Sequence, residues 1–415
     1  MTTDTGLAPE LTVFAVPSPA MADRERTLED LRILVDVRRV YQIRWTPELV
    51  ASNVARFYRQ RPRAAGPTRA VDARLLVVTA VDRTPRAEPR TGRRSAGASA
   101  TLVAATQALR TSTAQAAAVR ASTGPEAARD LMLLLGTDVR SHLDENRQPW
   151  DGRIDEVHRD LTGARGWTSA SELFHALNHT VRWVVLRNFE QMPHCLHVGS
   201  HEDVDMLTDD YPETIRVMNA RPNVRCLPRW GGPHWVDIGG QDMWFDVRFV
   251  GDGYYDPRWA AHILDRRVWN EHGFYAPNAE DYLETLAYHA VVHKRAFAAD
   301  YRPRLAGMAA ALERSGWDAA ELADPRRMKA LLDGILDRRG YRYCRPRDVN
   351  VFYNFAATGH RLPRVRRKLA GIARKALRVA YRLQQPLRER YWRTRDALGV
   401  RTPSLDGILP PAPSR

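Results

Sequence analysis

Hydrophobic and polar residues in the middle of the chain follow first a helical and then a strand-like spacing. Apolar residues recur on one helical face from Ser169 to His179, with a serine available as the N-cap. The segments Trp183–Leu186, Asp203–Leu207 and Met243–Val250 show the short apolar or alternating pattern of strands. From Pro257 onward the spacing is helical again, over Arg258–Arg267, then Ala279–Phe297, then shorter pieces through Arg338. This order of elements predicts an α+β fold, with a small mixed sheet followed by a helical C-terminal cap.

The N-terminal part of the chain has a different pattern. Thr27–Arg61 shows helical periodicity, and Arg74–Asp82 is the β-branched run of a buried strand. Pro125–Leu135 is an amphipathic helix that ends at Gly136. Between them, Arg83–Thr123 is rich in Ala, Arg, Ser and Thr, and we expect a loop-rich insertion there. These segments together predict a small α/β unit.

With 415 residues, the chain is longer than one average domain. The predicted organisation is a flexible leader (1–25), a small α/β N-terminal domain (26–145), a catalytic domain (154–256), a helical cap (257–358), a basic amphipathic helix (359–401) and a disordered tail (402–415). No apolar run approaches the roughly 20 residues that span a bilayer, and the first residues lack the pattern of a signal peptide. Three cysteines without metal-ligand spacing indicate reduced thiols. These features predict a cytoplasmic protein.

The net charge of +14 is concentrated near the C-terminus. Residues 361–401 contain fourteen Arg and Lys against two acidic residues, a net charge of +12, so only +2 remains for the rest of the chain. Apolar residues recur there at three- or four-residue steps, which predicts a basic amphipathic helix. This helix either packs its apolar stripe on its own domain or lies, through residues 361–395, on the anionic inner face of the cell membrane. Nucleic-acid binding is disfavoured, because the rest of the chain is nearly neutral.

Three aspartates are candidate metal ligands. Asp203 and Asp205 lie two residues apart in a predicted strand, so their side chains point to one face. Asp246 lies in a later strand and joins them if the two strands are neighbours. Adjacent carboxylates repel each other unless a cation lies between them, and hard oxygen ligands suit Mg²⁺ or Mn²⁺. Gly199 and Ser200, just ahead of the pair, would let backbone N–H groups approach a phosphate.

Several basic residues near these strands have two interpretations each. His289 and His293 lie four residues apart on a predicted helix, where they are either satisfied helix residues or, with Lys294, contacts to substrate or phosphate. A zinc site is disfavoured, because no third ligand is evident in the sequence. Arg187, at a predicted strand end, either holds a phosphate bidentately or forms a surface ion pair.

The turn after the last predicted strand is also open to two interpretations. Its sequence is Gly-Asp-Gly-Tyr-Tyr-Asp, which favours a tight turn. Asp252, Tyr254 and Tyr255 either only form this turn or line a pocket for the acceptor substrate.

A Gly-Ser turn, an Asp-x-Asp strand and a later strand aspartate together resemble the nucleotidyltransferase superfamily of the polymerase-β type. The segments VVLRNFEQMP, DVDMLTDDYPETIRVMNARP, FDVRFVGDGYYDPRWA and DYLETLAYHAVVHK are similar to bacterial nucleotidyltransferase-like proteins of capsule or lipopolysaccharide synthesis. The resemblance implies a mixed sheet of that type, with Asp203 and Asp205 as metal ligands and Asp246 as third carboxylate and general base. The connection from Gly-Ser to the aspartate pair is shorter than in that superfamily.

These observations predict a metal-dependent transferase that moves a nucleotidyl or phospho-alcohol group from a nucleotide-activated donor to a sugar or a growing surface glycan. Related choline-phosphate and fukutin-type ribitol-phosphate transferases imply a CDP-linked donor. One alternative is a glycosyltransferase, because Asp-x-Asp also holds Mn²⁺ against the diphosphate of a nucleotide sugar, although no glycine-rich turn is evident before it. The other alternative is a non-catalytic adaptor that binds a membrane or nucleic acid through the basic helix.

Overall fold

The computed structural model describes residues 11–17, 24–59, 74–82, 100–112, 118–190, 192–193, 203–222, 231–295, 297, 301–318, 321–348, 350–359 and 390. The chain divides into two compact units, one that ends at Ala164 and one that begins at Arg165. Gly199 and Ser200 lie outside the described residues. The same holds, except for Arg390, for everything after Gly359, which includes the predicted basic helix and tail.

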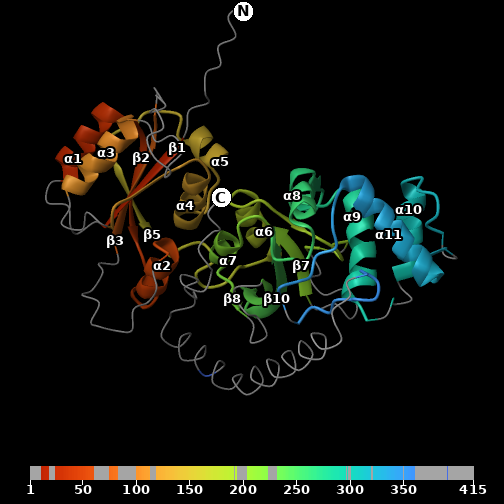
Figure 1. The fold of residues 1–415 in the computed structure, drawn as a ribbon. Helices are drawn as coiled ribbons and strands as arrows, with labels where there is room; N and C mark the ends of the chain where they lie inside the picture. The colour runs from red at the N-terminus through yellow and green to blue at the C-terminus, as the bar shows by residue number, and fades with distance from the viewer. Residues whose placement is uncertain are drawn as a thin grey trace, which may run out of the picture. The chain divides into compact units, whose positions relative to one another are not determined.

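The first unit contains a five-stranded mixed sheet. Its elements are β1 (Leu11–Pro17), α1 (Arg24–Leu34), β2 (Asp36–Arg44), a 3₁₀ turn (Pro47–Leu49), α2 (Val50–Phe57), β3 (Arg74–Val81), α3 (Ala100–Thr111), β4 (Arg120–Thr123), α4 (Gly124–Leu135), α5 (Val139–Glu145) and β5 (Ile154–His158). The strand order is β4-β1-β3-β2-β5, and only the β2–β5 pair is parallel. Helices α1 and α3 cover one face and α4 covers the other (Figure 1).

The structure of this unit differs from the sequence prediction in four places. β1 lies in the predicted flexible leader, yet all seven of its residues are buried between two strands. α3 and β4 lie where the composition predicts a loop-rich insertion. β5 pairs with β2, so the first unit extends past the predicted start of the catalytic domain at residue 154. In each case the stabilising partner is distant in sequence, and a local pattern does not reveal it.

β2 is the fourth difference, because its sequence has a helical spacing. Val37 and Val40 are three residues apart, a step that indicates a helix, but both pack in the same core on one face of the sheet. A β-bulge between Val37 and Arg39 explains this. The bulge adds one residue to the strand, so two residues that are three apart in sequence lie on the same face of the sheet. The pairing of β2 with β3 therefore overrides the local helical pattern.

His142, on α5, is buried in the first unit, with 2% of its surface exposed. Its Nε2 atom lies 3.0 Å from the hydroxyl of Thr79 on β3, and the Nδ2 atom of Asn146 lies 3.4 Å from its Nδ1 atom. Burial, together with the charge of Arg39, lowers the pKa of His142 to about 4. The ring thus stays neutral in the folded unit at pH values where the unfolded chain binds a proton.

We expect the stability difference between the wild type and His142→Gln to shrink as the pH falls from about 6.5 to about 4.5. Above the unfolded-state pKa the histidine is neutral in both states, and the wild type keeps its full stability. Below it only the unfolded chain is protonated, so the wild type alone loses about 1.4 kcal/mol per pH unit. Hydrogen exchange of the β3 amides at a series of pH values measures this. If the stability difference between the wild type and His142→Gln stays constant or widens in acid, the conclusion that His142 stays neutral in the folded unit is wrong.

The second unit contains a second five-stranded mixed sheet and a group of helices. Its elements are α6 (Ala170–Asn178), β6 (Trp183–Val185), β7 (Asp203–Thr208), α7 (Tyr211–Met218), β8 (Arg221–Pro222), β9 (Gly232–Ile238), β10 (Gln241–Phe249), α8 (Pro257–Asp265), β11 (Val268–Asn270), β12 (Phe274–Ala276), α9 (Ala279–Tyr288) with a π-helical turn (His289–His293), α10 (Tyr301–Ala311), a 3₁₀ turn (Glu321–Ala323) and α11 (Pro325–Arg339). The strand order is β6-β7-β10-β9-β8, with β7 and β10 parallel, and β11 pairs with β12.

This arrangement confirms the predicted α+β architecture with mixed sheets. The three predicted strands are β6, β7 and β10, and the predicted helices α6, α8 and α9 are present. Ser169 caps α6 by accepting from the backbone N–H of Glu172. α9, α10 and α11 lie together beside the sheet and share one core with α8 (Figure 1). Among the described helices, none is both long and apolar enough to cross a membrane.

Candidate metal centre

The three predicted aspartates converge where the start of β7 pairs with the middle of β10. These strands are parallel neighbours, and their register places Asp246 directly opposite Asp205. Asp203 precedes Asp205 by two residues, so it lies on the same face of the sheet. One carboxylate oxygen from each of the three side chains lies within 4.8 Å of the others. This spacing is compatible with a single cation bound by all three carboxylates.

Two buried arginines bind the aspartates. Arg187 follows β6, and its Nη2 atom donates to Oδ1 of Asp205 and, at 3.3 Å, to the hydroxyl of Tyr254. Arg248, on β10, donates to Oδ2 of Asp246 at 2.7 Å. Its other terminal nitrogen donates to Asp348 at 3.1 Å. Arg187 therefore forms an ion pair, but the pair is buried, whereas the predicted alternative was an ion pair at the surface.

The three carboxylates still repel one another in spite of these arginines. Burial raises the pKa of Asp205; Arg187 opposes this shift, while the negative charges of Asp203 and Asp246 add to it. The Oδ1 atom of Asp246 is buried and has no hydrogen-bond partner among the described residues. A buried oxygen of this kind is costly unless it is bound, and a divalent cation would both bind it and relieve the repulsion. The residues present thus fit Mg²⁺ or Mn²⁺.

A pocket of about 400 Å³ opens over the three aspartates. It also contains basic groups, among them Lys294 and Arg295 just after the π-helical turn. The pocket is lined by Arg187, Asp203, Asp205, Pro233, Trp244, Asp246, Arg248, Tyr254, His289, His293, Lys294, Arg295, Asp348, Asn350, Val351 and Phe352. Carboxylates and cationic side chains together suit a ligand that carries phosphate groups together with a metal ion.

The two histidines of the π-helical turn have different surroundings. His289 is 2.7 Å from the hydroxyl of Tyr254 through its Nδ1 atom, so it belongs to the hydrogen-bonded group around Arg187. His293 is only 4% exposed, and neither of its ring nitrogens has a hydrogen-bond partner among the described residues. Burial, reinforced by nearby Arg187 and Arg248, lowers the pKa of His293 well below its usual value. The ring is therefore neutral and offers one donor and one acceptor in the pocket.

The turn after β10 contributes one side chain to the pocket. Tyr254 lines the pocket, and its ring centroid lies 4.0 Å from that of His293. Asp252 instead accepts backbone N–H bonds from Phe249 and Tyr254, within its own turn. Tyr255 packs in the core against Trp259. Neither Asp252 nor Tyr255 lines the pocket, so the structural interpretation fits these two better than a substrate contact.

Sequence reasoning missed three charged residues that line the pocket, Arg248, Arg295 and Asp348. Arg248 lies two residues after Asp246 in the same strand, and this spacing alone would have placed it on the same face. Asp348 lies about a hundred residues further along, in a segment without regular structure, and no local pattern indicates it. Strand periodicity could therefore have found Arg248, whereas only the fold reveals Asp348.

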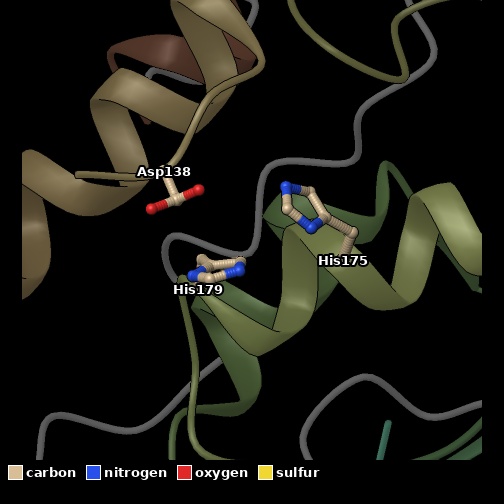
Figure 2. A group of neighbouring side chains, drawn as sticks. All are labelled: Asp138, His175 and His179. Atoms are coloured by element: carbon tan, nitrogen blue, oxygen red, sulfur yellow. The ribbon is translucent and has the colours of Figure 1, made fainter. Parts of the chain in front are cut away.

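A pair of histidines on α6 lies elsewhere in the second unit. Figure 2 shows His175 and His179 at the C-terminal end of this helix, and their ring centroids are 4.6 Å apart. Both side chains are exposed. Asp138, drawn in the same figure, belongs to the first unit, where it caps α5 by accepting backbone N–H bonds from Arg140 and Ser141. We assign this pair no function, because exposed histidines lack the burial and positioning of a site.

Comparison with known proteins gives no relative for this chain. It matches no family model, and neither the curated proteins nor the solved structures that were compared include a significant match.

Proposed function

We propose that this protein is a divalent-metal-dependent transferase of a phosphorus-containing group. The donor would be a nucleotide-activated molecule, and the acceptor would be a hydroxyl group of a sugar or glycan. One observation carries the proposal: three aspartates from two parallel strands converge in a pocket that also contains cationic side chains. This combination suits phosphoryl transfer, in which negative charge on the donor must be held and neutralised.

Each residue of the site has a distinct part in this proposal. Asp203, Asp205 and Asp246 would hold the cation, which when bound supplies charge neutralisation at the donor phosphates. Arg187 keeps the buried carboxylate of Asp205 in one orientation. Lys294, which lines the pocket, would bind donor phosphate oxygens.

The acceptor hydroxyl needs a group that takes its proton. The oxygen of the hydroxyl forms a bond to phosphorus, the bond from phosphorus to the leaving oxygen breaks with its electron pair, and the hydroxyl proton leaves. Asp246, whose carboxylate lines the pocket, is the candidate base. His293, with both ring nitrogens unpaired among the described residues, would orient the hydroxyl.

Cell-surface polysaccharide synthesis at the inner face of the cell membrane stays a prediction from the sequence. The basic segment 361–395 would hold the enzyme near lipid-linked acceptors. It lies, apart from Arg390, outside the described residues.

A thermal-unfolding screen tests the proposed function. CTP, CDP-choline, CDP-ribitol and UDP-sugars are each added with Mg²⁺, with Mn²⁺ or with EDTA. We expect stabilisation by a cytidine nucleotide only when the metal is present, by about 2.7 kcal/mol at a ligand concentration a hundred times the Kd. Metal-dependent stabilisation by UDP-sugars alone would favour the glycosyltransferase alternative. No stabilisation by any metal–nucleotide pair would refute the transferase proposal.

A further inference from the structure

We propose that two tryptophans beside the aspartates, Trp244 and Trp235, form a subsite that holds sugar rings of the acceptor by stacking. The inference rests on the proposed transferase function and names the place where its acceptor binds. It follows from the register of the second sheet, from the position of Trp244 in the pocket, and from the polar groups at the two ends of the tryptophan pair.

The register places the tryptophans in one row across four strands. Trp244 on β10 pairs with Asp203 on β7 on one side and with Trp235 on β9 on the other. Trp235 in turn pairs with Arg221 on β8. Directly paired residues lie on the same face of a sheet, and neighbouring strands are about 4.8 Å apart. The row therefore begins at a proposed metal ligand and crosses the sheet for roughly 14 Å.

The two indole rings give this face of the sheet an apolar surface that is not fully covered. Phe245, Val247 and Val236, on the opposite face of the same strands, are buried in the core. Trp244 and Trp235 are only partly buried, and their ring centroids are 5.5 Å apart. Trp244 also lines the pocket over the aspartates. Adjoining aromatic rings at the edge of a polar pocket are typical of a ligand-binding surface.

A neutral sugar matches both the rings and the groups around them. One face of a sugar ring presents C–H groups with a partial positive charge, which suit the electron-rich face of an indole. The hydroxyl groups at the edge of the sugar need hydrogen-bonding partners. Asp203 lies at one end of the row, and at the other end Arg221 forms an ion pair with Asp242, which precedes Trp244 by two residues.

The donor is assigned to the other side of the pocket. Lys294 and Arg295, whose charges suit donor phosphates, follow the π-helical turn of α9. The core of the helices α8 to α11 includes Val184 of β6 and Leu207 of β7, at the opposite edge of the sheet from β8. Phe352 also lines the pocket there, 5.8 Å from the guanidinium of Arg295, and offers a surface for a nucleotide base. The tryptophan row is therefore left for the acceptor.

A sugar ring stacked on Trp244 would lie next to the proposed metal centre. Trp244 stands opposite Asp203 and precedes Asp246 on the same face by two residues, roughly 7 Å along the strand. A hydroxyl at the edge of this ring would point towards the carboxylates that bind the metal and take the proton. Trp235, one strand further from the aspartates, would hold the next sugar unit. The subsite thus favours an oligosaccharide acceptor over a single sugar.

Saturation-transfer NMR of the full-length protein with neutral sugars tests the subsite. The probes are the methyl glycosides of glucose, galactose, mannose and N-acetylglucosamine, together with maltose, lactose and chitobiose. We expect transfer to the ring C–H protons of at least one sugar, tighter binding of a disaccharide than of its single sugar, and affinity on the order of tenfold lower in Trp235→Leu. If none of these sugars binds the wild type, the inference is wrong. It is equally wrong if Trp235→Leu instead abolishes transfer to the base protons of CTP with Mg²⁺.

Two variants control for the loss of an aromatic ring. Trp235→Tyr keeps an aromatic face and should retain most of the sugar affinity. Trp269→Leu removes a tryptophan on β11 that is 56% exposed, and should leave sugar binding unchanged. A loss in Trp235→Leu no larger than in Trp269→Leu contradicts the subsite. If Trp235→Leu does not fold, the indole N–H signal that Trp235→Tyr removes should shift when sugar is added to the wild type, and a fixed signal contradicts the subsite.

The nucleotide measurements separate this inference from the proposed function. Metal-dependent stabilisation by a nucleotide should be the same in the wild type and in Trp235→Leu, because the substitution leaves the carboxylates in place. If that stabilisation is present but no sugar binds, the subsite is wrong and the transferase proposal stands. If no nucleotide stabilises the wild type with metal, yet sugar binding depends on Trp235, the transferase proposal fails and the sugar subsite stands.

Discussion

Replacing Arg248 with methionine should lower the free energy of unfolding of the second unit by about 3–5 kcal/mol. The guanidinium group is buried and donates to two carboxylates, those of Asp246 and Asp348. Methionine is of similar length and apolar, so the main change is the loss of the positive charge and its hydrogen bonds. Two carboxylates would then be left together without their common partner. The unfolding of the second unit, followed by hydrogen exchange of β10 amides, measures the loss.

Two further variants show whether buried charge is the cause. Arg248→Met combined with Asp348→Asn removes one of the stranded carboxylates, and we expect it to recover part of the lost stability. Arg327→Met breaks an ion pair on an exposed surface, where the arginine side chain is 57% exposed, and should cost less than about 1 kcal/mol. Equal losses in Arg248→Met and Arg327→Met would show that burial of this pair contributes nothing.

Asp203→Asn should reduce turnover on the order of a thousandfold and abolish stabilisation by Mn²⁺. The substitution removes one of three negatively charged ligands while it keeps the size of the side chain. Asp203 is less buried than Asp205. The change should therefore act on the metal site more than on folding. Rates with the nucleotide donor found in the thermal screen, and Mn²⁺ titrations, measure the two effects.

The control for this substitution is Asp209→Asn. Asp209 follows the same strand but forms an ion pair with Arg182 and does not line the pocket. Its turnover and Mn²⁺ affinity should equal those of the wild type. If Asp203→Asn retains both properties as well, the aspartates do not form the metal centre.

The sequence alone placed two of the three candidate metal ligands side by side, but it did not place the third beside them. The two-residue spacing of Asp203 and Asp205 within a strand fixed their common face, because strand side chains alternate. Whether Asp246 joins them depended on the pairing of two strands separated by α7, β8 and β9. Pairing at that separation is a property of the whole sheet. The sequence therefore predicted that the three aspartates meet only if these two strands are neighbours.

The residues with two interpretations are distinguished by their hydrogen-bond partners in the structure. Arg187 had equal claims as a phosphate contact and as an ion-pair partner, and its contact with Asp205 supports the second. His289 and His293 occupy similar positions in the sequence pattern, yet only His289 has a ring nitrogen hydrogen-bonded to Tyr254. Such differences depend on which side chains pack nearby, and a spacing rule does not contain that information.

By itself, the sequence determined β6, β7 and β10, the helices α6, α8 and α9, and the three acidic residues, because alternation and helical spacing are local properties of the backbone. Only the tertiary structure decided that β7 and β10 are parallel neighbours, that β1 is a buried strand, and that Arg248 links Asp246 to Asp348. These features come from contacts between segments far apart in the chain. Their energy depends on mutual burial and pairing, which no short stretch of sequence specifies.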